Sequence, residues 1–177
     1  MSTTYSIDSA HSTAHFTVRH MMITNVHGSF QKVTGTIVYD PASPGTSTVD
    51  AAIDTASIAT NEEQRDAHLR SADFLDAEHF STITFKSKKV ESTGDDELKV
   101  TGDLTIHGVT REVALQVEGP TPESKDPWGN ARIGLSARTK IKRGDFGLTW
   151  NAVLEAGGVL VGDEIKIEIE VSAIKAA

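Results

Sequence analysis

The sequence contains no cysteine. This absence excludes disulfide bonds, metal sites built on thiolates and a cysteine nucleophile. Other signatures of catalysis are missing too: there is no G-x-S-x-G nucleophile elbow and no H-E-x-x-H or H-x-E zinc motif. The glycine-containing stretch at 102–108, G-D-L-T-I-H-G, has no lysine and opens no helix, so it does not read as a phosphate loop. We therefore expect a protein that is not an enzyme and has no cofactor.

Long hydrophobic runs are also missing. No stretch approaches the roughly 18 apolar residues of a membrane-spanning helix. The first residues, M-S-T-T-Y-S-I-D, lack the basic and apolar regions of a secretory signal. The sequence thus predicts no transmembrane segment and, if it starts at the native residue, a cytoplasmic location.

Positive charge is in the minority, because the formal net charge is −8. An acidic chain repels phosphate backbones, which makes nucleic acid an unexpected partner. A length of 177 residues without a long structureless tract predicts one domain over residues 1–177.

The sequence instead shows the alternation of apolar and polar residues that is typical of β-strands. From Asp163 to Ile174, apolar and polar residues alternate strictly, which is typical of a strand with one buried face. Glu97 to His107 alternates in the same way and returns through Gly108 into Glu112 to Glu118, which predicts a hairpin. Further strands are expected at Thr13–Met22, Phe30–Tyr39, Val49–Ile58, Ser81–Val90, Ala131–Ile141 and Gly147–Leu154.

One helix is expected among these strands. Thr60 begins the sequence T-N-E-E, a capping box, and Asn61 to Arg70 is polar and compatible with a helix. At least eight strands joined by short turns, without a βαβ rhythm, predict an antiparallel all-β barrel or sandwich. We expect the helix to lie across one end of it.

Four of the seven histidines fall between Tyr5 and Phe30, which raises the possibility of a metal site. His11 and His15 are four residues apart, and on a strand their side chains would lie about 13 Å apart. A zinc site needs three or four converging ligands. Hydrogen-bonding histidines are therefore the simpler interpretation, and a metal protein would need three of His11, His15, His20, His27, His68, His79 and His107 to converge.

Basic residues gather on one predicted strand. Arg138, Lys140 and Lys142 share a face there, and Arg143 follows; they could attract an anionic group, or form an ordinary solvated face. Arg19 and Arg111 are separate basic candidates.

The large apolar residues leave open whether the barrel is filled or hollow, because an eight-stranded barrel is about the size at which the interior either packs shut or holds one small ligand.

The chain resembles the YceI-like family of lipid- and polyisoprenoid-binding proteins. The resemblance covers nearly the whole chain. It is carried by Y-S-I-D-S-A-H-S-T-A-H-F-T-V-R-H-M at 5–21, G-S-F at 28–30, the segment from Ile53 to Phe85, G-D-L-T-I-H-G-V-T-R-E-V at 102–113, R-G-D-F-G-L at 143–148 and V-G-D-E-I-K-I-E-I-E at 161–170. In this order the motifs are specific.

The resemblance implies an eight-stranded antiparallel, lipocalin-like barrel with a helix near one end and an elongated apolar tunnel. It also implies a long apolar ligand, such as a polyisoprenoid, a prenyl phosphate or a quinone tail, with no catalytic residue and no essential metal. Many relatives are exported, whereas this chain shows no signal peptide. The residues that we expect to line the tunnel are Phe16, Val18, His20, Met22, Phe30, Phe74, Phe85, Leu104, Phe146 and Trp150.

Two other interpretations stay open. A barrel filled by its own side chains would serve as an interaction or stress-response module, and a homodimer is compatible with either form of the barrel. A metal protein that depends on histidine is the third.

Overall fold

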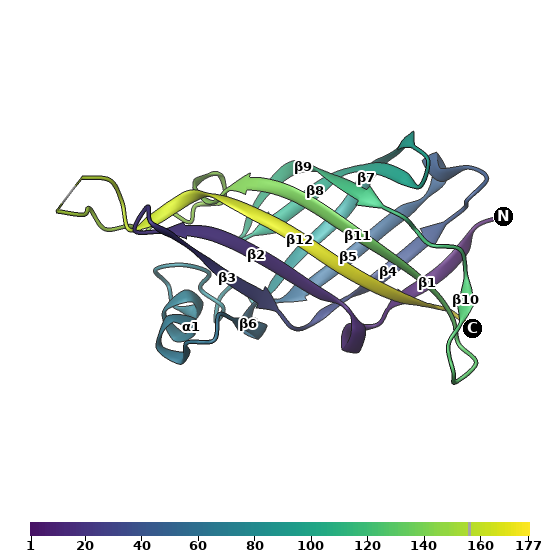
Figure 1. Ribbon diagram of the computed structural model, residues 1–177, viewed down its shortest axis with the longest axis horizontal. Helices are drawn as coiled ribbons and strands as arrows, with labels where there is room; N and C mark the ends of the chain where they lie inside the picture. Colours follow the sequence, from purple (N-terminus) through teal and green to yellow (C-terminus); the bar gives the residue numbers. More distant parts are fainter. Residues whose placement is uncertain (156) are drawn as a thin grey trace.

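The structure is a computed structural model that describes residues 1–155 and 157–177. Its strands curl into an elongated antiparallel barrel (Figure 1). The ring closes because β12 pairs with β1 on one side and with β11 on the other. This confirms the predicted fold class. The ring strands are β1 (Thr3–Ile7), β4 (Val33–Tyr39), β5 (Thr48–Asp54), β7 (Thr82–Gly94), β8 (Glu97–Ile106), β9 (Val109–Glu118), β11 (Ala131–Lys142) and β12 (Val161–Lys175).

Three further strands lengthen the barrel at one end. They are β2 (Thr13–His20), β3 (Thr24–Phe30) and β6 (Ile58–Ala59). Strand β12 is long enough to pair with β1 near its carboxyl end and with β2 over the rest, so β1 and β2 follow one another along the same edge. In the same way, β3 pairs with β6 while β4 pairs with β5. A short strand, β10 (Ser124–Lys125), pairs with β11 at the opposite end.

Helix α1 (Glu63–Arg70) lies beside β6 at the lengthened end, and both termini lie at the other end (Figure 1). The predicted helix is present, but the predicted cap is wrong. The N-cap is Glu62, whose carboxylate accepts hydrogen bonds from the main-chain N–H groups of Gln64 and Arg65. Thr60 instead donates its main-chain N–H to buried Asp66, which ties the strand before the helix to the helix itself.

Alternation sets the strand orientation wherever one face is buried. In β8 every second residue is buried, namely Leu98, Val100, Gly102, Leu104 and Ile106, and the residues that alternate with them are not. The β8–β9 hairpin pairs Ile106 with Val109 around His107 and Gly108, whose φ angles are 55° and 71°. Positive φ at both central positions gives the turn the twist that a two-residue hairpin needs.

Four predicted strand boundaries are wrong. Strand β2 ends at His20 because Met21 and Met22 adopt φ angles of 51° and 59° in a turn. The strand expected over Phe30–Tyr39 begins only at Val33, as β4, because Phe30 is the last residue of β3 and the chain breaks between them; β3 itself is not among the predicted strands. The strand expected over Val49–Ile58 is interrupted by a 3₁₀ turn at Thr55–Ser57. Gly147–Leu154 is not a strand, and apart from one isolated bridge at Val153 it forms loop.

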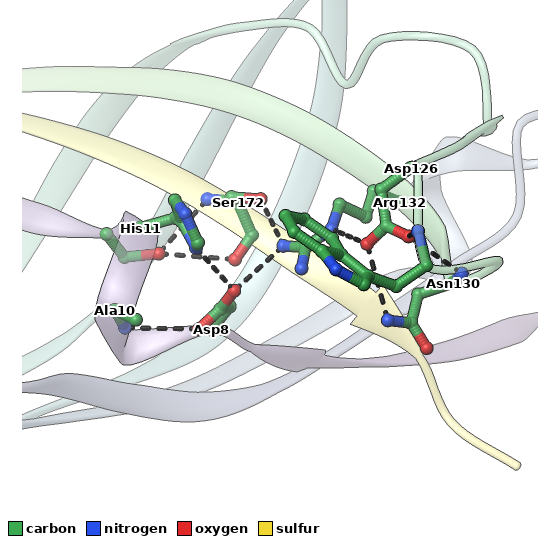
Figure 2. A network of polar contacts seen from close by, with 9 residues as sticks. Asp8, Ala10, His11, Asp126, Asn130, Arg132 and Ser172 are labelled. Carbon is green, nitrogen blue, oxygen red and sulfur yellow. Dashed lines mark hydrogen bonds and ion pairs between the residues drawn. The ribbon is translucent and has the colours of Figure 1, made fainter.

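A polar network on the outer face holds the loop after β9 against the barrel (Figure 2). Arg132 donates to the carboxylate of Asp126 over 2.6 Å, and to the carboxylate of Asp8 over 2.8 Å. It also donates to the hydroxyl of Ser172 over 3.1 Å. Asp8 in turn contacts the ring of His11 at 2.8 Å. One guanidinium therefore fastens the loop, the β1–β2 junction and β12 together.

Candidate ligand-binding cavity

The barrel encloses a cavity of about 240 Å³. Every ring strand contributes to its wall, because the inward-facing residue of each alternating pair points at the barrel axis. At the α1 end, Leu69 of the helix and Phe74 and Leu75 of the segment after it also contribute to the wall. The apolar wall residues are Ile7, Ala14, Phe16, Val18, Phe30, Val33, Ile37, Val49, Ala51, Ile53, Ile58, Leu69, Phe74, Leu75, Ile83, Phe85, Val90, Leu98, Val100, Leu104, Ile106, Val113, Leu115, Val117, Pro120, Leu135, Ala137, Ile141, Leu148, Val161, Ile165, Ile167, Ile169 and Val171.

Few polar residues border this described wall: they are His15, Tyr39, Ser47, Thr84, Thr139 and Arg143. His15 and Thr84 are exposed and alternate with the inward-facing Phe16 and Phe85, so their side chains point away from the cavity. The Thr139 hydroxyl is already used, since it donates to the main-chain oxygen of Ala114 over 3.0 Å. Burial raises the pKa of Tyr39, and the nearby carboxylates of Asp96 and Asp40 add to this, so the phenol stays neutral. The interior is therefore apolar and offers few groups that could bind a polar ligand.

Arg143 is the one cation on the described wall, and its side chain is almost fully buried. Its guanidinium donates to the main-chain oxygens of Leu148, Trp150, Val161 and Gly162 over 2.7–3.1 Å. Burial lowers its pKa, an effect that Asp163 opposes. Because four carbonyl groups already occupy the donors, Arg143 serves first to fix the chain around the end of the cavity.

Aromatic rings cluster where α1 meets the barrel. The ring of Trp150 lies 4.8 Å from that of His68 and 5.1 Å from that of Phe74, measured between centroids. On the strands, Phe16 lies opposite Gly28 in the β2–β3 register and 5.7 Å from Phe30. A side chain at Gly28 would stand 2.3 Å from the Phe16 ring, so the glycine gives that ring its place on the wall.

Six of the ten residues expected to line the tunnel are on the cavity wall. They are Phe16, Val18, Phe30, Phe74, Phe85 and Leu104. Whether they contact a ligand stays a prediction.

The other four are not on the wall. Met22 is 59% exposed, and its predicted inward orientation is wrong because β2 ends two residues earlier. His20 is half-buried at the last position of β2, beyond the cavity. Phe146 is fully buried in the core but is not among the residues that line the cavity, and Trp150 contacts Phe74 without lining the cavity itself.

The residues that the prediction missed are mostly aliphatic. Ile165, Ile167 and Ile169 of β12 line the cavity, and the alternation of that strand already marked them as facing inward. The predicted set consists mainly of aromatic residues and therefore does not include them. No signal in the sequence separates the buried Arg143 from its exposed neighbours Arg138, Lys140 and Lys142.

Those three neighbours point away from the cavity, on the outer face of β11. Arg138 lies 3.6 Å from Glu118 and opposite Glu168, and Lys142 lies opposite Glu164. Acidic neighbours thus balance much of this strand, as the solvated-face interpretation expects.

The histidines are spread over the barrel. His11, His68 and His79 each pair with an aspartate close by in sequence, and His27 bonds the hydroxyl of Thr17. Within residues 1–155 and 157–177, no three histidine, aspartate or glutamate side chains are grouped closely enough to hold a metal ion. Over the same residues, no helix has the length and apolar character needed to cross a membrane.

Comparison with known proteins identifies the family. Residues 5–173 match the family model described as the YceI-like domain. The chain belongs to the YceI-like family. A UPF0312 protein of Vibrio cholerae serotype O1 is 41% identical over 146 residues, which cover 81% of this chain and 77% of that protein.

Solved structures of this architecture include two informative neighbours. The YCEI protein of Campylobacter jejuni is 35% identical, with a TM-score of 0.75 over 90% of each chain. A polyisoprenoid binding domain from Saccharophagus degradans, implicated in plant cell wall breakdown, has a TM-score of 0.69 over 97% of this chain and 98% of that domain. At 15% identity, this second likeness shows the fold alone.

Proposed function

We propose that the barrel binds a long apolar ligand, of the isoprenoid or quinone-tail class, and carries it without chemical change. The observation behind this proposal is the cavity itself, whose wall is almost entirely aliphatic and aromatic. Such a wall favours hydrocarbon over water and offers few groups to orient a polar molecule. The polyisoprenoid binding described for the Saccharophagus degradans domain supports the ligand class by analogy of fold.

The cavity volume limits the ligand. A cavity of about 150 Å³ lined by leucine, isoleucine and phenylalanine holds one benzene molecule. In proportion, 240 Å³ accommodates a branched chain of about ten carbons, or two isoprene units. A longer tail would have to displace side chains or extend out of the barrel.

Burial of such a chain contributes to the free energy of binding. Transfer of five carbons from water contributes about 3–4 kcal/mol. The efficiency typical of larger ligands reduces this to about 1.5 kcal/mol per isoprene unit. Affinity should therefore depend mainly on how much of the tail fits, and specificity for the head group should be weak.

A binding role without catalysis fits the chemistry of the described wall. The titratable side chains of this described wall that face the cavity are those of Tyr39 and Arg143, and Arg143 is committed to main-chain carbonyl groups. General acid–base catalysis needs positioned groups whose pKa values lie near the working pH.

The alternative of a filled barrel would leave no continuous cavity, and the barrel has one.

Native mass spectrometry of protein purified without detergent tests the proposal. We expect the protein either to retain an added mass of lipid size or to gain one on titration with prenyl phosphates or quinones. A protein that stays at the mass of the bare chain in both experiments would refute it.

A further inference from the structure

Exposed apolar side chains are concentrated at one end of the barrel. Two loops supply them: the β2–β3 turn and the loop that leads into β12. Ile23 is 68% exposed and Val153 is 86% exposed. Large exposed apolar groups that lie together mark an interaction surface rather than ordinary surface scatter. We call this set the apolar tip, and it consists of Met21, Met22, Ile23, Val153 and Val159.

The two loops form one surface because they contact each other. The main-chain N–H of Met21 donates to the oxygen of Leu160 over 2.7 Å. Met22 packs so closely on Gly158 that a β-carbon there would stand 2.1 Å from the methionine sulfur. Val153 and Val159 pair in an isolated β-bridge, which joins the two sides of the second loop.

The apolar tip lies next to the end of the cavity. Arg143, on the cavity wall, donates to the main-chain oxygens of Trp150 and Val161, which are the two stems of the second loop. Figure 1 shows the described residues on both sides of position 156 projecting beyond the barrel at the end where α1 lies. The same stems therefore border both the apolar interior and the exposed apolar surface.

We propose that the apolar tip inserts into the surface of a lipid bilayer, so that the ligand passes between the bilayer and the cavity. This inference rests on the proposed function. An isoprenoid is stored in bilayers, and a transfer path through water would expose its whole tail. Docking at the end of the cavity shortens that path.

The shape and charge of the tip favour a bilayer over a protein partner. The apolar tip is a small set of exposed side chains on two loops, whereas a protein interface needs a broad complementary surface. Arg19 stands at the base of the tip and donates to the main-chain oxygen of Met22, where its cation would meet the head groups. Because the chain carries a net charge of −8, anionic lipids would repel it, and we expect it to bind vesicles of neutral phosphatidylcholine.

Co-sedimentation with phosphatidylcholine vesicles tests this, using the variant with Ile23→Glu and Val153→Glu. Two buried charges in place of apolar groups should weaken vesicle binding by at least about tenfold. Trp128→Glu is the matched control, because Trp128 is 77% exposed but lies in the loop after β9, near the opposite end. We expect the control to bind vesicles as the wild type does.

A vesicle-free titration with decyl-ubiquinone separates this inference from the proposed function. If the wild type binds no quinone, the proposed function fails, and the sedimentation still judges the apolar tip by itself. Equal vesicle binding by the double variant and the wild type, or none by the wild type, would overturn the bilayer proposal. So would a dimeric wild type that becomes monomeric in the double variant, since the tip would then bind a second copy. The single variant Val153→Glu replaces the double variant if the latter does not fold.

Discussion

Arg143 donates through Nη1 to the main-chain oxygen of Trp150 over 2.9 Å. This bond joins the cavity wall to the loop that precedes β12. Three further carbonyl groups receive bonds from the same guanidinium. A buried cation thus organises one end of an otherwise apolar barrel.

Replacing Arg143 should destabilise the fold. Arg143→Met leaves four main-chain oxygens without their donor, and we expect a loss of roughly 3 kcal/mol in the free energy of unfolding. Arg143→Lys keeps the charge but not the planar donors, so an intermediate loss is expected. Urea unfolding measures both. A change in Arg143→Met of less than about 0.5 kcal/mol, the scale of ordinary surface substitutions, would contradict this role.

Acid should loosen the loop after β9. Hydrogen bonds from Arg132 hold the pKa of Asp126 at about 2, below its ordinary 3.8. The pKa of Asp8 is lowered too, by Arg132 first and then by His11. A depressed folded-state pKa gives stability that is complete above about pH 4 and is lost as the pH falls towards 2.

The matched variant is Asp126→Asn. It should be less stable than the wild type at neutral pH, and the difference should shrink between pH 4 and pH 2. Thermal unfolding across this range measures it. A constant difference at all pH values would show that Asp126 does not titrate as described.

Ligand affinity should depend on tail length. We expect each of the first two isoprene units to tighten binding by about tenfold, and further units to add less, because the cavity has room for about ten carbons. A titration series of prenyl alcohols with one to four units measures this. Affinity that is independent of tail length would argue for binding through the head group.

Gly28 should be intolerant of a side chain. In Gly28→Ala the new methyl group would overlap the Phe16 ring, and we expect a loss of about 1–3 kcal/mol from this overpacking. Chemical unfolding measures the loss. Gly45→Ala is the control, since its nearest contact would be an ordinary 3.6 Å. Equal stability of the two variants would be unexpected.

The parts of the fold that could be predicted are those where one physical constraint repeats. Strand β8 buries every second residue, and in β12 half-buried residues alternate with exposed ones from Glu164 to Glu170, so the period of two is visible in the sequence of both. Strand β1 was missed because only Tyr5 and Ile7 mark its inner face, and five residues are too few to establish a period. The turn at Met21 and Met22 was also missed, because positive φ at methionine has no signature in residue type.

Whether a residue expected on the tunnel wall does line the cavity depends on whether it lies on a regular strand. Phe85 and Leu104 lie on regular strands, where parity fixes which residues face inward. Phe146 and Trp150 lie in a 3₁₀ turn and a loop, where parity has no meaning, so their orientation depends on the bonds of Arg143. The capping error has a similar origin, because Thr60 and Glu62 are both able to cap and tertiary contact with Asp66 decides between them.

Filling the cavity tests the central claim most directly. Ala137 lies on the cavity wall, and its neighbour Ser136 on β11 points outward, so Ala137→Phe and Ser136→Phe place the same ring inside and outside the barrel. Decyl-ubiquinone should bind Ala137→Phe at least about tenfold more weakly than wild type, and Ser136→Phe as the wild type does. Thermal unfolding of both variants shows that each is folded. If folded Ala137→Phe binds the quinone as tightly as Ser136→Phe does, the cavity is not where the ligand binds.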